Sequence, residues 1–266
     1  VLFRSTGTIL GTTWGIAKSA VAKPVRVLGC TGSGATAGVI AGINWAISDH
    51  TTGPAVMNLS LGGGPSKSED DAIASAVADG ITVVVAAGNS NDDACNYSPA
   101  REPTAITVGA SDSSDARASF SNYGSCVDIF APGGSGYTNG GVNSTWHYLS
   151  TDPSNTSTYE NESGTSMAAP HVTGALAQWM QGITLPGDVS TVPTLAWTWL
   201  KLNATCDVVT YTDSTRSVQS PNRFLNIGTA ASAPCAPRNV AASQAAGQST
   251  VTWDEVATAN GSAITG

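Results

Sequence analysis

The fold of this chain is decided by one stretch of its sequence, Ile81-Thr-Val-Val-Val-Ala-Ala-Gly88-Asn89. Residues 81–86 form a nearly continuous β-branched run, which is typical of a strand buried on both faces of a parallel sheet. The run ends in small residues followed by Asn89. Because ligand sites in open α/β sheets lie at the carboxyl ends of the strands, this turn is a candidate for a functional site.

Helical and strand-like patterns alternate on both sides of this run. Besides residues 81–86, we expect strands over residues 25–28, 55–60, 104–108 and 127–130, and helices over residues 36–49, 68–79, 166–181 and 190–202. The helix over residues 68–79 has clear boundaries, because Ser66 or Ser68 can cap its start and Gly80 follows its end. This alternation predicts an α/β fold with a mostly parallel sheet and helices on both faces.

Two segments depart from the alternation. Residues 133–163 are rich in Gly, Ser, Thr and Asn and show no periodicity, which predicts a long surface loop. Residues 229–236 are rich in Ala, Ser and Pro, which is typical of a linker. Beyond it, residues 237–242 and 249–253 alternate like strands, so we interpret residues 237–266 as the truncated start of a β-sandwich.

The composition excludes several classes of protein. Only 11% of the 266 residues are charged, 41% are apolar, and the net charge is −8. Lys and Arg form no cluster, so we expect no nucleic-acid partner. No apolar run approaches the roughly 18 residues that span a membrane. A weakly charged chain rich in Gly, Ser, Thr and Asn is typical of a compact extracellular protein.

The cysteines suggest disulfides rather than a metal site. The chain has five cysteines, and none belongs to a C-x-x-C pair of the kind that binds zinc. In a secreted protein, an odd number of cysteines indicates either a free thiol or a partner in a segment that is missing.

Three segments carry residues that could do chemistry. Ser166 begins a predicted helix, where free N–H groups and the helix dipole favour negative charge, so it is either a nucleophile or an N-cap. The sequence around Ser166 does not match the nucleophile motif G-x-S-x-G of α/β-hydrolases, because Ala168 stands where that motif has its last glycine. Asn89 is either an oxyanion donor or an ordinary turn residue. The glycines after Ser60 either admit a substrate backbone or form a plain loop.

Together, these segments resemble the subtilisin family of serine proteases. The matching stretches are the nucleophile motif Gly164-Thr-Ser-Met-Ala-Ala-Pro-His171, the oxyanion-hole turn Ala86-Ala-Gly-Asn89 and the substrate-binding strand Ser60-Leu-Gly62. The resemblance covers about residues 7–227, and residues 96–103 and 118–130 bring it closest to the proteinase K and aqualysin branch. It implies a subtilisin-like α/β fold in three layers.

The resemblance also implies acyl transfer by a serine nucleophile. Ser166 would attack the scissile carbonyl, while its own N–H and the Asn89 side chain hold the oxyanion. The residues that would pair with the substrate backbone are Ser60, Leu61, Gly62, Gly32, Ser33 and Gly34. Those that would line the pocket for the residue before the cut are Ala86, Ala87 and Gly88. Such catalysis needs no cofactor.

The catalytic His and Asp of the family have no counterpart in this sequence. The family carries the His in a His-Gly-Thr-His-Val-Ala-Gly-Thr motif, which this chain enters only at Gly7-Thr8, so the His would fall near Arg4. Residues 1–5 do not fit the family, and we interpret them as a non-native end that precedes a peptidase domain over residues 6–228. His171 matches a family position that is not the general base. Without these two residues, the 266-residue chain is expected to be nearly inactive as a protease.

The resemblance further implies a disulfide and a calcium site. Cys95 and Cys126 resemble a disulfide pair, and Cys30 matches a position whose partner precedes the catalytic His. Whether Cys206 pairs with Cys235 stays open. The calcium ligands would be the Asp128 carboxylate and the backbone oxygens of Pro103 and Ala105. The alternative is that Asp128 only accepts backbone hydrogen bonds.

The leading interpretation is a monomeric, secreted serine endopeptidase that acts on proteins or peptides. The C-terminal strands look like the start of a fibronectin type III-like module. The alternative, from another functional class, is an inactive subtilase-like pseudoenzyme or binding scaffold.

Overall fold

A six-stranded sheet forms the centre of the computed structural model, which describes residues 2–51, 53–136, 140–145, 159–184, 186–212, 220–228, 241–245 and 248–252. Its strands are β1 (Ala55–Leu59), β2 (Ile81–Ala86), β3 (Ile106–Ser111), β4 (Ile129–Pro132), β7 (Thr205–Cys206) and β8 (Arg223–Phe224). They lie in the order β1-β2-β3-β4-β8-β7, and each neighbouring pair is parallel except β7 and β8. The predicted, mostly parallel sheet is confirmed.

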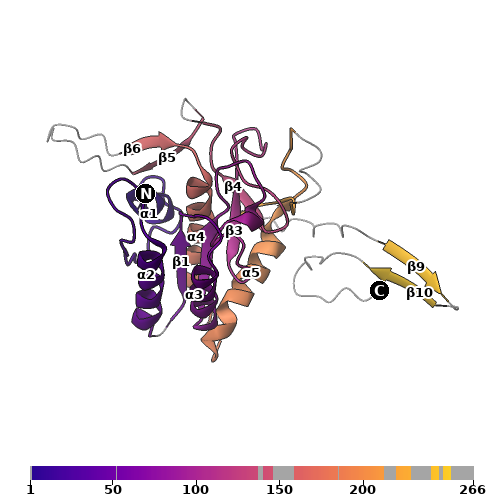
Figure 1. The fold of residues 1–266 in the computed structure, drawn as a ribbon, viewed down its shortest axis with the longest axis horizontal. Coiled ribbons are helices and arrows are strands. Elements are labelled where there is room, and N and C mark those ends of the chain that lie inside the picture. The colour runs from indigo at the N-terminus through magenta and orange to yellow at the C-terminus, as the bar shows by residue number, and fades with distance from the viewer. Residues whose placement is uncertain are drawn as a thin grey trace.

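Helices cover both faces of this sheet (Figure 1). They are α1 (Leu2–Leu10), α2 (Thr36–Asp49), α3 (Lys67–Ala78), α4 (Thr165–Gln181) and α5 (Val192–Asn203), with the short 3₁₀ helices η1 (Ala94–Asn96) and η2 (Val189–Thr191). Val83 and Val85 of β2 pack in one core with α2 and α3, whereas Val84 and Ala86 pack in the other with α4 and α5. Because β2 is buried between two helical layers, its sequence is apolar along its whole length.

Two antiparallel hairpins lie outside the sheet. The first joins β5 (Val142–Thr145) and β6 (Tyr159–Glu162), and the second joins β9 (Ala241–Ala245) and β10 (Gln248–Thr252). The prediction that residues 133–163 form a loop throughout was therefore wrong. The mainly polar strands β5 and β6 carry no alternation of apolar residues that could have revealed them. β9 and β10 overlap the two strands expected after the linker.

The predicted strand over residues 25–28 is not formed. Val25 and Val27 both face Gly42 of α2, as residues two apart do in an extended segment. Yet the amides of residues 25–28 donate to no backbone oxygen in the part of the chain that the structure describes. β1 forms the edge of the described sheet on this side. Residues 25–28 therefore have the apolar pattern of a strand, but no described strand lies beside them to pair with.

Helix α1 packs against α4 and against the β5–β6 hairpin, as Figure 1 shows. It contains part of the segment that fits the family poorly. Arg4 forms an ion pair with Glu162 of β6 at 2.6 Å, and its backbone oxygen accepts a hydrogen bond from Ser144. Ser5 is buried and donates to Ser60 Oγ at 3.0 Å. Arg4, near which the resemblance places the family's His, thus lies in a packed helix.

The disulfide implied for Cys95 and Cys126 is present. It joins the 3₁₀ helix η1 to the segment before β4, across a sequence separation of 31. Cys30 is free and exposed. Cys206 is disulfide-bonded, and Cys235 lies outside the described residues.

We expect the double variant Cys95→Ser/Cys126→Ser to lose roughly 3–4 kcal/mol of unfolding free energy, because the unfolded chain regains the freedom of a long loop. Urea unfolding measures this difference. Cys30→Ser is the matched control, and its free energy of unfolding should stay within about 0.5 kcal/mol of the parent. Equal stability of the double variant and the control would contradict the prediction.

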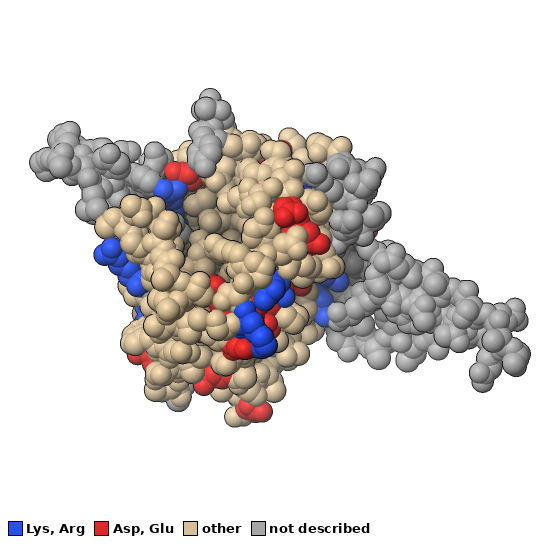
Figure 2. Space-filling view, viewed as in Figure 1, with Lys and Arg blue, Asp and Glu red and all other residues tan. Residues whose placement is uncertain are grey.

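Charged residues are few and scattered on the face shown in Figure 2, where Lys and Arg gather into no patch. None of the helices in the described ranges is both long and apolar enough to cross a membrane.

Candidate active site

Ser166 lies in the first turn of α4, directly after Thr165, where the helix begins. The N-cap of this helix is Gly164, so the alternative that Ser166 is an N-cap was wrong. Backbone N–H groups of a first turn have no acceptor inside the helix, so the Ser166 N–H can donate to a bound group. The Ser166 hydroxyl donates to the Ser60 backbone oxygen at 3.3 Å, just beyond the carboxyl end of β1.

Asn89 ties the carboxyl end of β2 to the start of α4. Its side-chain oxygen accepts hydrogen bonds from the Thr165 backbone N–H and from Thr165 Oγ1, both at 2.9 Å. The Gly88 N–H donates to the same Thr165 hydroxyl at 3.1 Å. With its oxygen on Thr165, the Asn89 amide directs Nδ2 toward Gly164. Asn89 therefore does more than complete a local turn, and it presents an N–H donor near Ser166.

The turn after β2 depends on a buried side chain that sequence reasoning missed. Gly88 has φ 103°, and a Cβ there would collide with Asn122 Nδ2. Asn122 is fully buried; it donates to the Ala87 oxygen at 2.8 Å and accepts from the Ser90 N–H at 2.9 Å. In the sequence, Asn122 stands out only as a polar residue within residues 118–130, a segment that resembles the family.

A cavity of about 300 Å³ opens beside Ser166 and Asn89. Of the predicted substrate-binding residues, it is lined by Leu61, Gly62, Ala86, Ala87 and Gly88. Ser60 borders the site through its hydrogen bonds with Ser166. The structure does not bring Gly32, Ser33 and Gly34 to this cavity, and it leaves all three exposed.

A model of the subtilase family (Peptidase_S8) matches residues 4–206. This chain belongs to the subtilase family. Its curated relatives include the extracellular serine proteinase of Thermus sp. (strain Rt41A), 56% identical over 175 residues, and the alkaline serine exoprotease A of Vibrio alginolyticus, 51% identical over 175 residues. Each match covers 66% of this chain, but only 40% of the Thermus protein and 30% of the Vibrio protein. The chain thus spans less than half the length of these relatives.

Solved structures confirm the expected fold of this subtilase. A cold adapted subtilisin-like serine proteinase has a TM-score of 0.72 and 40% sequence identity, over 85% of this chain and 74% of that chain. A protease from Pseudoalteromonas arctica has a TM-score of 0.71 and 33% identity, over 84% of this chain and 68% of that chain.

The described histidines of the subtilase are engaged elsewhere. His171 Nδ1 donates to the Met167 backbone oxygen at 2.8 Å within α4, and burial lowers the pKa of His171. His50 bonds Asp79 at 2.7 Å and the Gly53 oxygen at 3.0 Å. Burial alone would lower the pKa of His50, but these two partners raise it above its usual value. His147 lies outside the described residues. Within the described ranges, no imidazole bonds the Ser166 hydroxyl.

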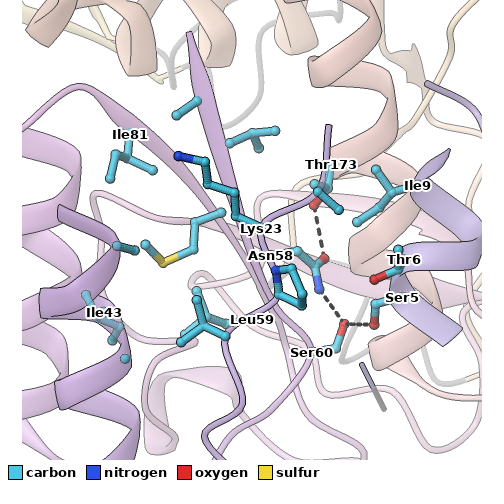
Figure 3. A pocket seen from close by; sticks show the side chains of 18 of the residues that line it. Ser5, Thr6, Ile9, Lys23, Ile43, Asn58, Leu59, Ser60, Ile81 and Thr173 are labelled. Atoms are coloured by element: carbon cyan, nitrogen blue, oxygen red, sulfur yellow. Dashed lines mark hydrogen bonds between the residues drawn. The ribbon is translucent and has the colours of Figure 1, made fainter. Parts of the chain in front are cut away.

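A chain of hydrogen bonds runs from Thr173 of α4 through Asn58 to Ser60, and these links are drawn in Figure 3. Thr173 Oγ1 donates to Asn58 Oδ1 at 3.0 Å, and Asn58 Nδ2 donates to Ser60 Oγ at 2.9 Å. Ser60 Oγ in turn donates to the Ser166 backbone oxygen at 2.9 Å. Asn58 projects from β1, so these bonds fix the start of α4 against the sheet. Sequence reasoning did not single out Asn58 or Thr173.

We expect Asn58→Ala to lower the unfolding free energy of the subtilase by about 1–3 kcal/mol, because Thr173 and Ser60 both lose a hydrogen-bond partner away from water. Urea unfolding would measure the loss. Asn44→Ala on α2 is the control, because Asn44 is exposed and its change should stay within about 0.5 kcal/mol. A change no larger than that of the control would show that the network does not hold the site.

Asp128 is the buried acid of the predicted calcium site. Its Oδ2 accepts a hydrogen bond from the Thr107 N–H at 2.8 Å, and burial raises the pKa of its carboxyl to about 6. The described residues contain no group of three or more His, Cys, Asp and Glu side chains that could hold a metal ion. A site here would therefore rest on one carboxylate together with backbone oxygens.

Proposed function

We propose that this chain is the larger part of the peptidase domain of a secreted serine endopeptidase, which cleaves peptide bonds through an acyl-enzyme on Ser166. The observation that carries the proposal is that Ser166 and Asn89 line one cavity and are joined through Thr165. The names of its relatives, an extracellular serine proteinase and an alkaline serine exoprotease, support the activity and the secretion.

In the proposed reaction, Ser166 Oγ attacks the carbonyl carbon of the scissile bond and gives its proton to a general base. The resulting oxyanion accepts hydrogen bonds from the Ser166 N–H and Asn89 Nδ2. When the tetrahedral intermediate collapses, the C–N bond breaks, the amine leaves with that proton, and the acyl group stays on Oγ until water hydrolyses it.

The substrate would bind in extended form. Ser60, Leu61 and Gly62 would pair with its backbone on one side, and the exposed residues Gly32, Ser33 and Gly34 on the other. The cavity of about 300 Å³ beside Ala86, Ala87 and Gly88 would receive the side chain before the cut. Substrates are proteins or peptides, and the protein acts as a monomer.

The general base and its orienting carboxylate would come from residues upstream of this chain. In this proposal residues 1–5 are a non-native end, the peptidase domain covers residues 6–228, and residues 229–236 are a linker. Residues 237–266 begin a fibronectin type III-like module. The peptidase belongs to the proteinase K and aqualysin branch, as its sequence over residues 96–103 and 118–130 suggests.

We further propose a structural calcium ion held by the Asp128 carboxylate and the backbone oxygens of Pro103 and Ala105. A buried acid with a raised pKa gains from a nearby cation, and hard oxygen ligands suit Ca²⁺. Excess Ca²⁺ should raise Tm at pH 7, whereas Asp128→Asn should abolish that increase. Asp112→Asn, on the loop after β3, is the control and should keep it. An equal response of both variants would rule out Asp128 as a ligand.

One observation favours the alternative of an inactive scaffold. Arg4, not a histidine, occupies the position near which the resemblance places the general base, and it is paired with Glu162. The gene sequence upstream of Gly7 separates the two proposals. A His-Gly-Thr-His motif preceded by a strand containing Asp supports the peptidase. A gene that natively begins with Val-Leu-Phe-Arg-Ser would support the scaffold.

A further inference from the structure

Cys206 of β7 forms a disulfide whose partner is not among the described cysteines. Of the five cysteines in the chain, Cys95 and Cys126 are bonded to each other, and Cys30 is a free thiol. Cys206 is half-buried and disulfide-bonded. Within one chain its partner can only be Cys235, which lies outside the described residues, in the segment interpreted above as a linker.

The side chain of Cys206 lies on the face of the sheet that α5 covers. Cys206 is the cross-strand partner of Arg223 in the antiparallel pair of β7 and β8, and directly opposed residues of such a pair point to the same face. The guanidinium carbon of Arg223 lies 5.7 Å from the centre of the Trp197 ring of α5. Phe224, the next residue of β8, packs with Phe130 in a different core cluster. The Cys206 sulfur is therefore directed toward the side of Trp197.

The chain also leaves the sheet on this face. Side chains alternate along an extended segment, so Leu225 and Ile227 share the orientation of Arg223. Leu225 packs against the core cluster that contains α4 and α5, and its N–H donates to the Phe130 oxygen at 2.8 Å. Ile227 is 49% exposed. Apolar surface thus remains accessible at the point where the linker begins.

Trp197 provides an aromatic surface beside this exit. Its ring is half-buried, and Lys201, one turn later in α5, places Nζ 5.5 Å from the ring centre. Together with Arg223, two cationic side chains border one indole. Lys and Arg side chains offer hydrogen-bond donors and no acceptors. The surface formed by Trp197, Lys201 and Arg223, called here the Trp197 surface, therefore suits a segment that presents apolar rings and backbone oxygens.

The linker has this composition. Residues 229–236 read Thr-Ala-Ala-Ser-Ala-Pro-Cys-Ala, and Pro237 follows. Pro234 and Pro237 on either side of Cys235 favour an extended polyproline II conformation, in which no C=O group is bonded internally. The segment from Gly228 to Cys235 reaches at most about 25 Å, and that from Arg223 to Gly228 at most about 18 Å. Since the strands of a pair lie about 5 Å apart, Cys235 can return to Cys206 across the Trp197 surface.

We propose that residues 229–236 fold back over the Trp197 surface and that Cys235 forms the disulfide with Cys206. The two thiols lose two protons and two electrons as the S–S bond forms. A disulfide-containing oxidant outside the cytosol accepts them and is reduced to two thiols. Residues 237–266 then begin next to a fixed anchor on β7, so the module proposed there is held close to the sheet. This inference concerns the junction alone and is independent of the proposed catalysis.

Disulfide mapping of the complete 266-residue chain, produced in an oxidising compartment, tests the pairing. Trypsin leaves Cys206 and Cys235 on separate peptides, residues 202–216 and 224–238. Without reductant the two peptides should appear as one linked species, which separates on reduction. Thiol titration of the denatured protein should find one thiol in the parent and two in Cys235→Ser. The control Cys30→Ser should have none.

Limited proteolysis of the linker tests whether it lies on the Trp197 surface. Elastase, which cleaves after small residues, should cut residues 229–233 about tenfold faster in Cys235→Ser than in the parent, because the segment is no longer held. Trp197→Ala should raise the cleavage rate by a similar factor while the disulfide stays intact. Since Trp197 also packs against the core, Lys201→Gln is a second variant that removes a donor without opening a cavity, and it should raise the rate about threefold. Thr198→Ala, exposed on the same helix, is the control and should match the parent.

Three results would overturn the proposal: Cys206 linked to another cysteine, a disulfide-linked dimer on a non-reducing gel, or equal cleavage of the parent and Cys235→Ser. If Trp197→Ala and Lys201→Gln were cut no faster than Thr198→Ala, the Trp197 surface would not be the docking site of the linker.

Discussion

We expect Ser166→Ala to abolish the proposed peptide hydrolysis in a protein that joins this chain to an upstream segment carrying the catalytic His and Asp. The expected fall in kcat is about 10⁶-fold, the size measured for the nucleophile of subtilisin itself and not a value obtained from this structure. The physical reason is that Ser166 places its hydroxyl at the start of α4 and against the cavity beside Asn89. The neighbouring Thr165 hydroxyl also lines this cavity, but it is already held by hydrogen bonds with Asn89 Oδ1 and the Gly88 N–H. Initial rates on a chromogenic peptide substrate measure the loss.

A control serine variant and a labelling experiment test whether the loss of activity is specific to Ser166. Ser113 is exposed on the loop after β3, so Ser113→Ala should keep the parent rate. A fluorophosphonate probe should label the parent and Ser113→Ala, and leave Ser166→Ala unlabelled. If Ser166→Ala still cleaved peptides and took up the probe, another residue would be the nucleophile and the proposed site would be wrong.

We expect Asn89→Asp to lower the kcat of the proposed reaction by about 10²–10³-fold with little change in KM; this range comes from the equivalent donor of subtilisin. The variant keeps an oxygen for the two hydrogen bonds from Thr165, so the link between β2 and α4 stays in place. It loses the Nδ2 donor that faces Gly164, and places negative charge near the developing oxyanion. The loss should therefore fall on the transition state.

Asn89→Ala separates the structural role of Asn89 from its chemical one. It removes both the donor and the acceptor, so it should lower Tm as well as kcat. Asn89→Asp should lower kcat while Tm stays close to that of the parent. If the Asp variant retained full kcat, Asn89 would act only by holding Thr165, and the oxyanion would need another donor.

Where burial and pattern agree, the fold could be predicted from the sequence. Residues 81–86 were expected as a buried strand and form β2 with the same bounds, since both faces of this strand are covered. The helix expected over residues 166–181 begins one residue earlier, at Thr165. Residues 25–28 have an equally apolar pattern but form no strand. A strand needs a partner, and no described segment of the chain pairs with the backbone amides of residues 25–28.

The site could be predicted only through the family resemblance. Ser166 and Asn89 each had an ordinary local explanation, and only the fold shows that Thr165 links them. Asn122 and Asn58 were missed because their effect depends on contacts far along the chain: Asn122 with the turn at Gly88, and Asn58 with Thr173. A polar residue that acts through tertiary hydrogen bonds leaves no periodic signal in its own neighbourhood.

The open edge of β1 also governs how the isolated chain behaves at high concentration. Open strand edges template edge-to-edge association between molecules, which charged or proline-containing edges normally prevent. The sequence of β1, Ala-Val-Met-Asn-Leu, contains neither a charge nor a proline. Losses of soluble protein during refolding should therefore grow with the square of concentration, as expected when pairs of molecules nucleate the aggregate. Val56→Lys should reduce this aggregation because it places a charge on the strand edge, although some apolar packing beside β2 would be lost.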